Sequence, residues 1–157
     1  MSPHGLSAAT SMTREEAKVF IDKYFELRAP IRAYMDKTVE DALTNGYVAT
    51  MFGRRRPTPD LKSSSFMVRE GAKRAAINMP IQGTEADLMK LAMLHVEENL
   101  GDLGKQLLQV HDSILVECPA ENVEKVATIL KDTMEQVSKL PVHLKVDVST
   151  GKNWGEL

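Results

Sequence analysis

The chain has 157 residues, 43% hydrophobic and 27% charged, a composition typical of globular proteins and unlike that of disordered ones. No apolar run approaches the roughly 20 residues of a membrane helix, so we expect no membrane partner. Residues 1–5 lack the basic start and the apolar stretch of a signal peptide, and the single cysteine, Cys118, cannot form an internal disulfide. These features favour a reducing compartment, and we predict a cytoplasmic protein.

Positive charge gathers in one stretch of a chain whose formal net charge is −2. Residues 54–74 contain two acidic residues and seven basic ones, which are Arg54, Arg55, Arg56, Lys62, Arg69, Lys73 and Arg74. Such asymmetry can create a local anion-binding surface on an acidic protein, although a solvated basic loop and helix face has the same pattern. The run from Arg54 to Arg56 could contact phosphates or pair with acidic side chains.

The first part of the chain predicts two helices and a short strand. Thr13 is a typical N-cap for a helix whose apolar residues recur at helical spacing. Pro30 should break or kink that helix, and a second one should extend to Gly46. Residues 47–52 indicate a short strand, which an Arg- and Pro-containing loop follows.

The middle of the chain predicts two more helices. One should begin near Phe66, and Pro80 must end or bend it because proline has no N–H to donate. Another should start near Thr84 and end at Gly101. This last helix is apolar on most sides, so we expect it to be buried.

The final third predicts a hairpin, a helix and a strand. Residues 106–110 and 114–117 are β-prone, and the polar residues 111–113 separate them, as in an antiparallel hairpin with a polar tip. A helix should run from residue 119 to about residue 140, and residues 143–148 should form the last strand. The expected fold class is α+β, with helices packed on a small antiparallel sheet.

The hairpin tip is the first candidate site. Asp112 ends a buried strand, and a hard cation prefers such a rigidly held oxygen ligand. Two-metal phosphoryl transfer needs at least two carboxylates close together. The alternative is that Asp112 and Ser113 simply make the turn.

A polar stripe of Arg74, Asn78 and Gln82 is the second candidate site. A spacing of four places Arg74 and Asn78 on one helical face, with Gln82 near it. Their side-chain donors could reach minor-groove acceptors, which lie in similar places in every base pair. The alternative is an ordinary exposed polar face.

Six segments in order along the whole chain share one resemblance: residues 1–7, 52–56, 59–61, 74–84, 108–112 and 151–154. Together they resemble the family A DNA polymerases of the bacterial DNA polymerase I type. The segment 108–112, Leu-Gln-Val-His-Asp, resembles the third conserved motif of that family, and 74–84 resembles the helix before it. Several motifs in the correct order are far more specific than any one of them.

The resemblance implies that residues 1–157 are the C-terminal portion of a polymerase palm, a single but incomplete catalytic domain. The implied reaction is template-directed addition of deoxynucleotides to a primer 3′ end, with Mg²⁺ ions as cofactors. The implied partners are primer–template DNA, deoxynucleoside triphosphates and the missing N-terminal part of the polymerase.

The resemblance also assigns roles to residues. Asp112 would be one of two aspartates that bind the catalytic metals, and His111 would lie beside the primer terminus. The stripe of Arg74, Asn78 and Gln82 would follow the minor groove of the primer–template. Arg54 and Arg55, from the Arg-rich segment, would also contact DNA.

The chain departs from the family pattern in two ways. Ser113 stands where the family usually has glutamate, and Glu117 is too far along the strand to replace it. No segment resembles the first motif, the nucleotide-binding helix or the thumb, so we expect the isolated chain to be inactive. Two alternatives remain open: a non-catalytic duplex-binding module derived from a palm, and a small nuclease that uses Asp112 with another acid. A start at Met1 fits both a split gene and a fragment.

Overall fold

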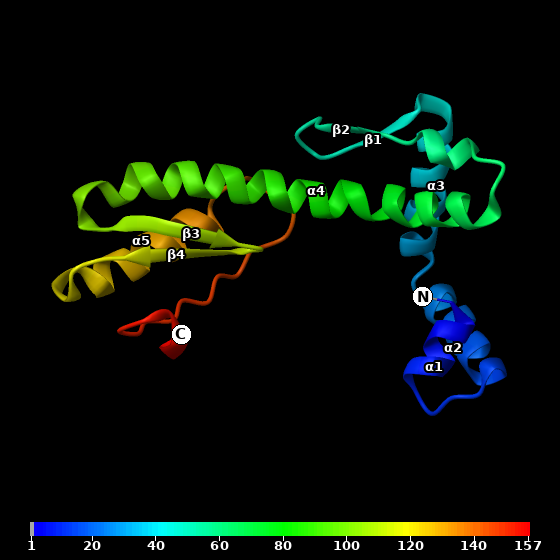
Figure 1. The fold of residues 1–157 in the computed structure, drawn as a ribbon, viewed down its shortest axis with the longest axis horizontal. Helices are drawn as coiled ribbons and strands as arrows, with labels where there is room; N and C mark the ends of the chain where they lie inside the picture. The colour runs from blue at the N-terminus through cyan, green and yellow to red at the C-terminus, as the bar shows by residue number, and fades with distance from the viewer. Residues whose placement is uncertain (1) are drawn as a thin grey trace. The chain divides into compact units, whose positions relative to one another are not determined.

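The structure is a computed structural model that describes residues 2–157; Met1, which opens the family-like segment 1–7, lies outside the described residues. The α-helices are α1 (Pro3–Ala9), α2 (Arg14–Leu27), α3 (Ala29–Asn45), α4 (Phe66–Leu100) and α5 (Val123–Glu135) (Figure 1). The strands are β1 (Tyr47–Ala49), β2 (Arg55–Pro57), β3 (Lys105–Val110) and β4 (Ser113–Glu117), which form two antiparallel pairs, β1–β2 and β3–β4. The predicted α+β class is confirmed.

The chain divides into two compact units. The first unit comprises the residues up to Ala49 together with Arg55–Pro80, and the second comprises Thr50–Arg54 together with Ile81–Leu157. Among the described helices, none combines the length and the apolar character that crossing a bilayer requires.

Local capping signals define the helices of the first unit. Thr13 caps α2 in a capping box: its hydroxyl accepts the Glu16 N–H at 3.2 Å, and the Glu16 carboxylate accepts the Thr13 N–H at 2.8 Å. Pro30 lies in the first turn of α3, where its missing N–H costs nothing. Gly46 ends α3 in a left-handed conformation with φ of 78°. The predicted N-cap and helix end are therefore confirmed.

The strand predicted over residues 47–52 is shorter and has a partner that we did not predict. β1 pairs with β2, with Tyr47 opposite Pro57, so part of the Arg-rich segment is strand and not loop. The chain reverses direction at Gly53, whose φ of 80° glycine adopts readily. The core of this unit joins the sheet to the helices through Ala42, Val48, Leu61 and Ala76.

The prediction of separate helices before and after Pro80 is wrong, because α4 is one helix from Phe66 to Leu100. Proline removes a single helical hydrogen bond, the one to the carbonyl of Ala76, and the turns on either side continue. Thr84 does not cap a new helix. Its hydroxyl accepts the Met51 N–H at 3.0 Å.

The second unit contains the predicted hairpin, which is confirmed. In the β3–β4 pair Val110 lies opposite Ser113, and Lys105 lies opposite Glu117 at the other end (Figure 1). The hydrophobic core of this unit consists of Val96, Leu100 and Val126 from α4 and α5, and its partly buried members are Leu103, Ile114, Val116, Cys118, Ile129, Leu130 and Met134. The hairpin thus rests on both helices.

The expectation that the helical segment from Thr84 to Gly101, now the second half of α4, is buried on most sides is wrong. The buried residues of its second half, Met89, Ala92, Val96 and Leu100, recur every three or four positions and form one stripe. Leu94, by contrast, is 62% exposed. A single thin sheet and one helix cover only one side of α4.

Two predictions for the end of the chain are also wrong. Helix α5 ends at Glu135, before residue 140, because the backbone tightens there and the Val137 N–H bonds to the Met134 carbonyl. Residues 143–148 form no strand. In this segment the Val146 N–H donates to the Glu135 carboxylate at 3.0 Å, where a strand would use a neighbouring backbone carbonyl.

Candidate functional site

Asp112 lies in the two-residue turn between β3 and β4. Its neighbour His111 has a φ of 53°, a left-handed conformation that is uncommon outside glycine. The Ser113 hydroxyl donates to the Val110 carbonyl at 2.8 Å, and the Gln109 side-chain amide donates to the His111 carbonyl. These local bonds, together with the strand pairing, hold the turn.

The Asp112 carboxylate takes no part in these bonds. Within residues 2–157 it forms no hydrogen bond and no ion pair, and it is exposed together with the His111 side chain. Ser113 stabilises the turn through its hydroxyl, whereas Asp112 lies in the turn without using its side chain, so both interpretations of Asp112 stay open. The carboxylate of Asp112 is therefore available to a ligand.

Two hollows border the turn. One of about 400 Å³ lies between α4 and the turn, with an apolar lining of Ala86, Met89 and Met93 and a polar lining of Glu85, Lys90, Gln109, His111 and Asp112. The other, of about 1090 Å³, is bordered by β4, α5 and residues 145–157. Asp112 lines both hollows.

The residues at the turn could supply part of the ligand set of a metal site. The carboxylate of Asp112 is a hard oxygen donor of the kind that Mg²⁺ binds. The described residues contain no group of three or more His, Cys, Asp or Glu side chains that could hold a metal by itself. Glu117 lies opposite Lys105 in the strand register, at the end of the hairpin remote from Asp112. It therefore does not complete the set of metal ligands.

The predicted stripe of Arg74, Asn78 and Gln82 lies on α4. Arg74 and Asn78 belong to the first unit and Gln82 to the second, and all three residues are exposed. This leaves their donors accessible, which both the groove-binding and the polar-face interpretations require. Their contact with DNA stays a prediction.

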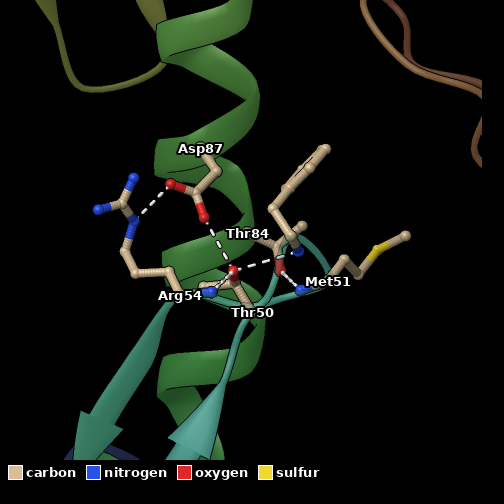
Figure 2. A network of polar contacts seen from close by, with 6 residues as sticks. Thr50, Met51, Arg54, Thr84 and Asp87 are labelled. Carbon is tan, nitrogen blue, oxygen red and sulfur yellow. Dashed lines mark hydrogen bonds and ion pairs between the residues drawn. The ribbon is translucent and has the colours of Figure 1, made fainter.

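Arg54 pairs with a buried acid that sequence reasoning missed as a partner. Its Nε lies 2.6 Å from the Asp87 carboxylate, whose other oxygen accepts the Thr50 hydroxyl at 2.8 Å (Figure 2). The hydrogen bond from Arg54, followed by that from Thr50, holds the pKa of Asp87 below its ordinary value. The two residues are 33 positions apart, and no sequence spacing indicates that they pair.

Arg55 has an aromatic partner in the first unit. Its guanidinium carbon lies 4.4 Å from the centroid of the Tyr47 ring, within the range of a cation–π contact. Arg54 and Arg55 are both exposed nonetheless. The sequence left open whether these arginines pair with acids, and Arg54 does so.

Comparison with known proteins gives consistent results. The family model for DNA polymerase family A matches residues 1–156. The thermostable DNA polymerase I of Thermus aquaticus is 48% identical over 155 residues, which are 98% of this chain and 19% of that protein. The DNA polymerase I of Deinococcus radiodurans is 46% identical over 155 residues, which are 98% of this chain and 16% of that protein.

A solved structure is similar along nearly the whole chain. It is the POL domain of Pol1 from M. smegmatis in complex with DNA primer-template and dNTP. The TM-score is 0.92 and the sequence identity is 38%, and the match covers 99% of this chain and 28% of the other. The chain thus spans less than a third of each of these relatives.

Proposed function

This chain belongs to DNA polymerase family A, and we propose that it supplies part of an active site that adds deoxynucleotides to a primer 3′ end under the direction of a template. The observation that carries the proposal is the exposed, unpaired carboxylate of Asp112 in the two-residue turn between β3 and β4. We further propose that residues 1–157 form one incomplete catalytic domain of the palm. The cytoplasmic location predicted above belongs to the same proposal.

Asp112 and His111 are the proposed catalytic residues. Family A DNA polymerases generally use divalent metals, and Asp112 is suited to hold Mg²⁺ as one carboxylate of a shared set. When bound, such ions activate the attacking 3′ oxygen and stabilise charge on the phosphates. We propose that the imidazole of His111, which is exposed beside Asp112, contacts the primer terminus.

Five exposed residues are proposed to bind the primer–template, namely Arg54, Arg55, Arg74, Asn78 and Gln82. The amides and the guanidinium group of the α4 stripe can donate to minor-groove acceptors common to all base pairs, so they would sense shape and not sequence. The arginines of the Arg-rich segment would instead neutralise phosphates. The deoxynucleoside triphosphate is the second proposed substrate.

The second unit has features that support a missing N-terminal part as partner. In the described residues β4 pairs only with β3, so its other edge has unpaired backbone groups that can accept a further strand. Residues 145–157 line the same hollow of about 1090 Å³ as β4. We propose that the missing part, with the second metal-binding aspartate, docks there.

Primer extension tests this function. The purified chain alone should not extend a primer, because one carboxylate cannot hold two metal ions. Mixed with a separately expressed N-terminal part of a family A polymerase, it should extend the primer, and Asp112→Asn should abolish that activity. Extension by the chain alone, with contaminating polymerase excluded, would contradict the assignment of an incomplete site.

A second candidate function is a non-catalytic duplex-binding module. Ser113 favours it, because a hydroxyl cannot supply the charge of the glutamate usual at this position, and its hydroxyl is already bonded to Val110. Under this alternative the mixture binds primer–template DNA but never extends it.

A further inference from the structure

We propose that Asp87 is a positioning residue: it holds Arg54 in the orientation in which the exposed end of its guanidinium group binds a phosphate of the primer–template backbone. The inference rests on the proposed function, because its ligand is the DNA of that reaction. It assigns Asp87 an indirect role in DNA binding, because this acidic residue acts through Arg54 and does not itself contact DNA.

The carboxylate of Asp87 is buried and has both oxygens engaged. Asp87 is 5% exposed, and a buried carboxylate is costly unless it is paired. One oxygen accepts Arg54 Nε at 2.6 Å, and the other accepts the Thr50 hydroxyl at 2.8 Å. Two different donors therefore fix the orientation of this carboxylate.

The backbone of Arg54 is held by the same residues. The Thr50 hydroxyl, besides donating to Asp87, accepts the Phe52 N–H and the Arg54 N–H, each at 3.2 Å. The Thr50 N–H donates to the Arg54 carbonyl at 2.9 Å, and the Met51 N–H donates to the Thr84 hydroxyl at 3.0 Å. The turn, and with it the base of the Arg54 side chain, is tied to α4 (Figure 2).

The far end of Arg54 is left outside this network. An Arg–carboxylate pair often uses two guanidinium nitrogens and both carboxylate oxygens. Here the second oxygen of Asp87 serves Thr50, and the ion pair is formed through Nε while the Arg54 side chain is 58% exposed. Figure 2 shows the guanidinium end directed away from α4.

This arrangement is suited to a phosphate. The two terminal nitrogens of a guanidinium group carry four N–H groups in a planar fork, which matches the spacing of phosphate oxygens. A side chain fixed at its base and at Nε loses little conformational entropy when it binds, so each hydrogen bond to the anion retains more of its strength. Without Asp87 the same side chain would sample many orientations.

The salt dependence of DNA binding tests the inference on the 157-residue chain. Each phosphate neutralised contributes about 0.9 to the slope of log affinity against log salt concentration. Arg54→Ala should flatten the slope by about one unit. Asp87→Asn should flatten it by a similar amount, although it removes a negative charge from the protein, which by itself favours DNA binding.

Asp36→Asn is the matched control. Asp36 pairs with Arg32 Nε at 2.9 Å, in an exposed pair within one helix, so this change makes the same charge difference and also releases an arginine. It should leave the slope unchanged or steepen it. Equal flattening by Asp36→Asn and Asp87→Asn would overturn the positioning role.

A double variant separates positioning from a general structural effect. If Asp87 acts through Arg54, the slope for Arg54→Ala with Asp87→Asn equals that for Arg54→Ala alone. Further flattening in the double variant would overturn the inference.

A measurement without any variant covers the case in which Asp87→Asn does not fold. On addition of duplex DNA to the wild-type chain, the NMR signal of Arg54 Nε–H should shift and that of Arg32 should not. An unshifted Arg54 signal at saturation would overturn the inference.

The outcome for the wild type distinguishes the two proposals. If the wild-type chain binds primer–template DNA and Arg54→Ala leaves the slope unchanged, the inference fails and duplex binding stands. If the wild-type chain shows no salt-dependent affinity for the duplex, both the duplex-binding function and the inference fail.

Discussion

Replacing Leu100 by alanine should destabilise the second unit by about 3 kcal/mol. Leu100 is 1% exposed and packs with Val96 and Val126 in the core that supports the β3–β4 hairpin. The change removes three buried carbon atoms, worth roughly 0.8 kcal/mol each, and the cavity left behind adds a further term. For a protein of this size, a loss of about 3 kcal/mol lowers the melting temperature by about 6–12 °C.

Denaturation by guanidinium chloride, followed by circular dichroism, measures this loss. Leu94→Ala is the matched control, because Leu94 is in the same helix and is 62% exposed. It should change the free energy of unfolding by no more than about 0.5 kcal/mol. If the two variants lose equal stability, the assignment of one buried and one exposed side to α4 is refuted.

Three further predictions concern the site. In an active, reconstituted polymerase, Asp112→Asn should lower the rate of nucleotide addition at least a hundredfold, about 2.7 kcal/mol of transition-state stabilisation, whereas Ser113→Ala should have a mild effect. Single-turnover kinetics would measure both rates. If Asp112→Asn keeps a near-normal rate, Asp112 is a turn residue only. Gln82→Ala should weaken extension of matched primers of every sequence alike and should change the ratio of matched to mismatched extension. If extension from matched and from mismatched primer ends responds identically, the stripe of Arg74, Asn78 and Gln82 is a structural face and does not contact the groove. The folded-state pKa of Asp87 lies below its ordinary value of 3.8, so the network stabilises the fold above that pH and this contribution is lost as the pH falls below it. Denaturation midpoints measured across this range should show a smaller acid dependence for Asp87→Asn than for the wild type.

Local patterns in the sequence were sufficient for the elements whose boundaries depend on nearby residues. The N-cap at Thr13 and the helix end at Gly46 depend on contacts within a few residues, and both were predicted. The hairpin around Asp112 was also predicted, because two β-prone runs with a short polar turn between them are adjacent in the chain. The order of the motifs along the chain indicated the family.

The tertiary structure decided what depends on residues far apart in the sequence. The buried pair of Arg54 and Asp87 joins positions 33 residues apart, and no pattern in either segment shows that their side chains meet. Likewise, the exposure of Leu94 depends on how much of α4 the hairpin and α5 cover. Residues 143–148 have the composition of a strand, yet a strand requires a neighbouring backbone to accept its hydrogen bonds, and here the Val146 N–H is bonded to a carboxylate instead. The energies of capping and turn formation depend on short segments of the chain. Burial and strand pairing instead depend on surfaces that meet only when the chain has folded.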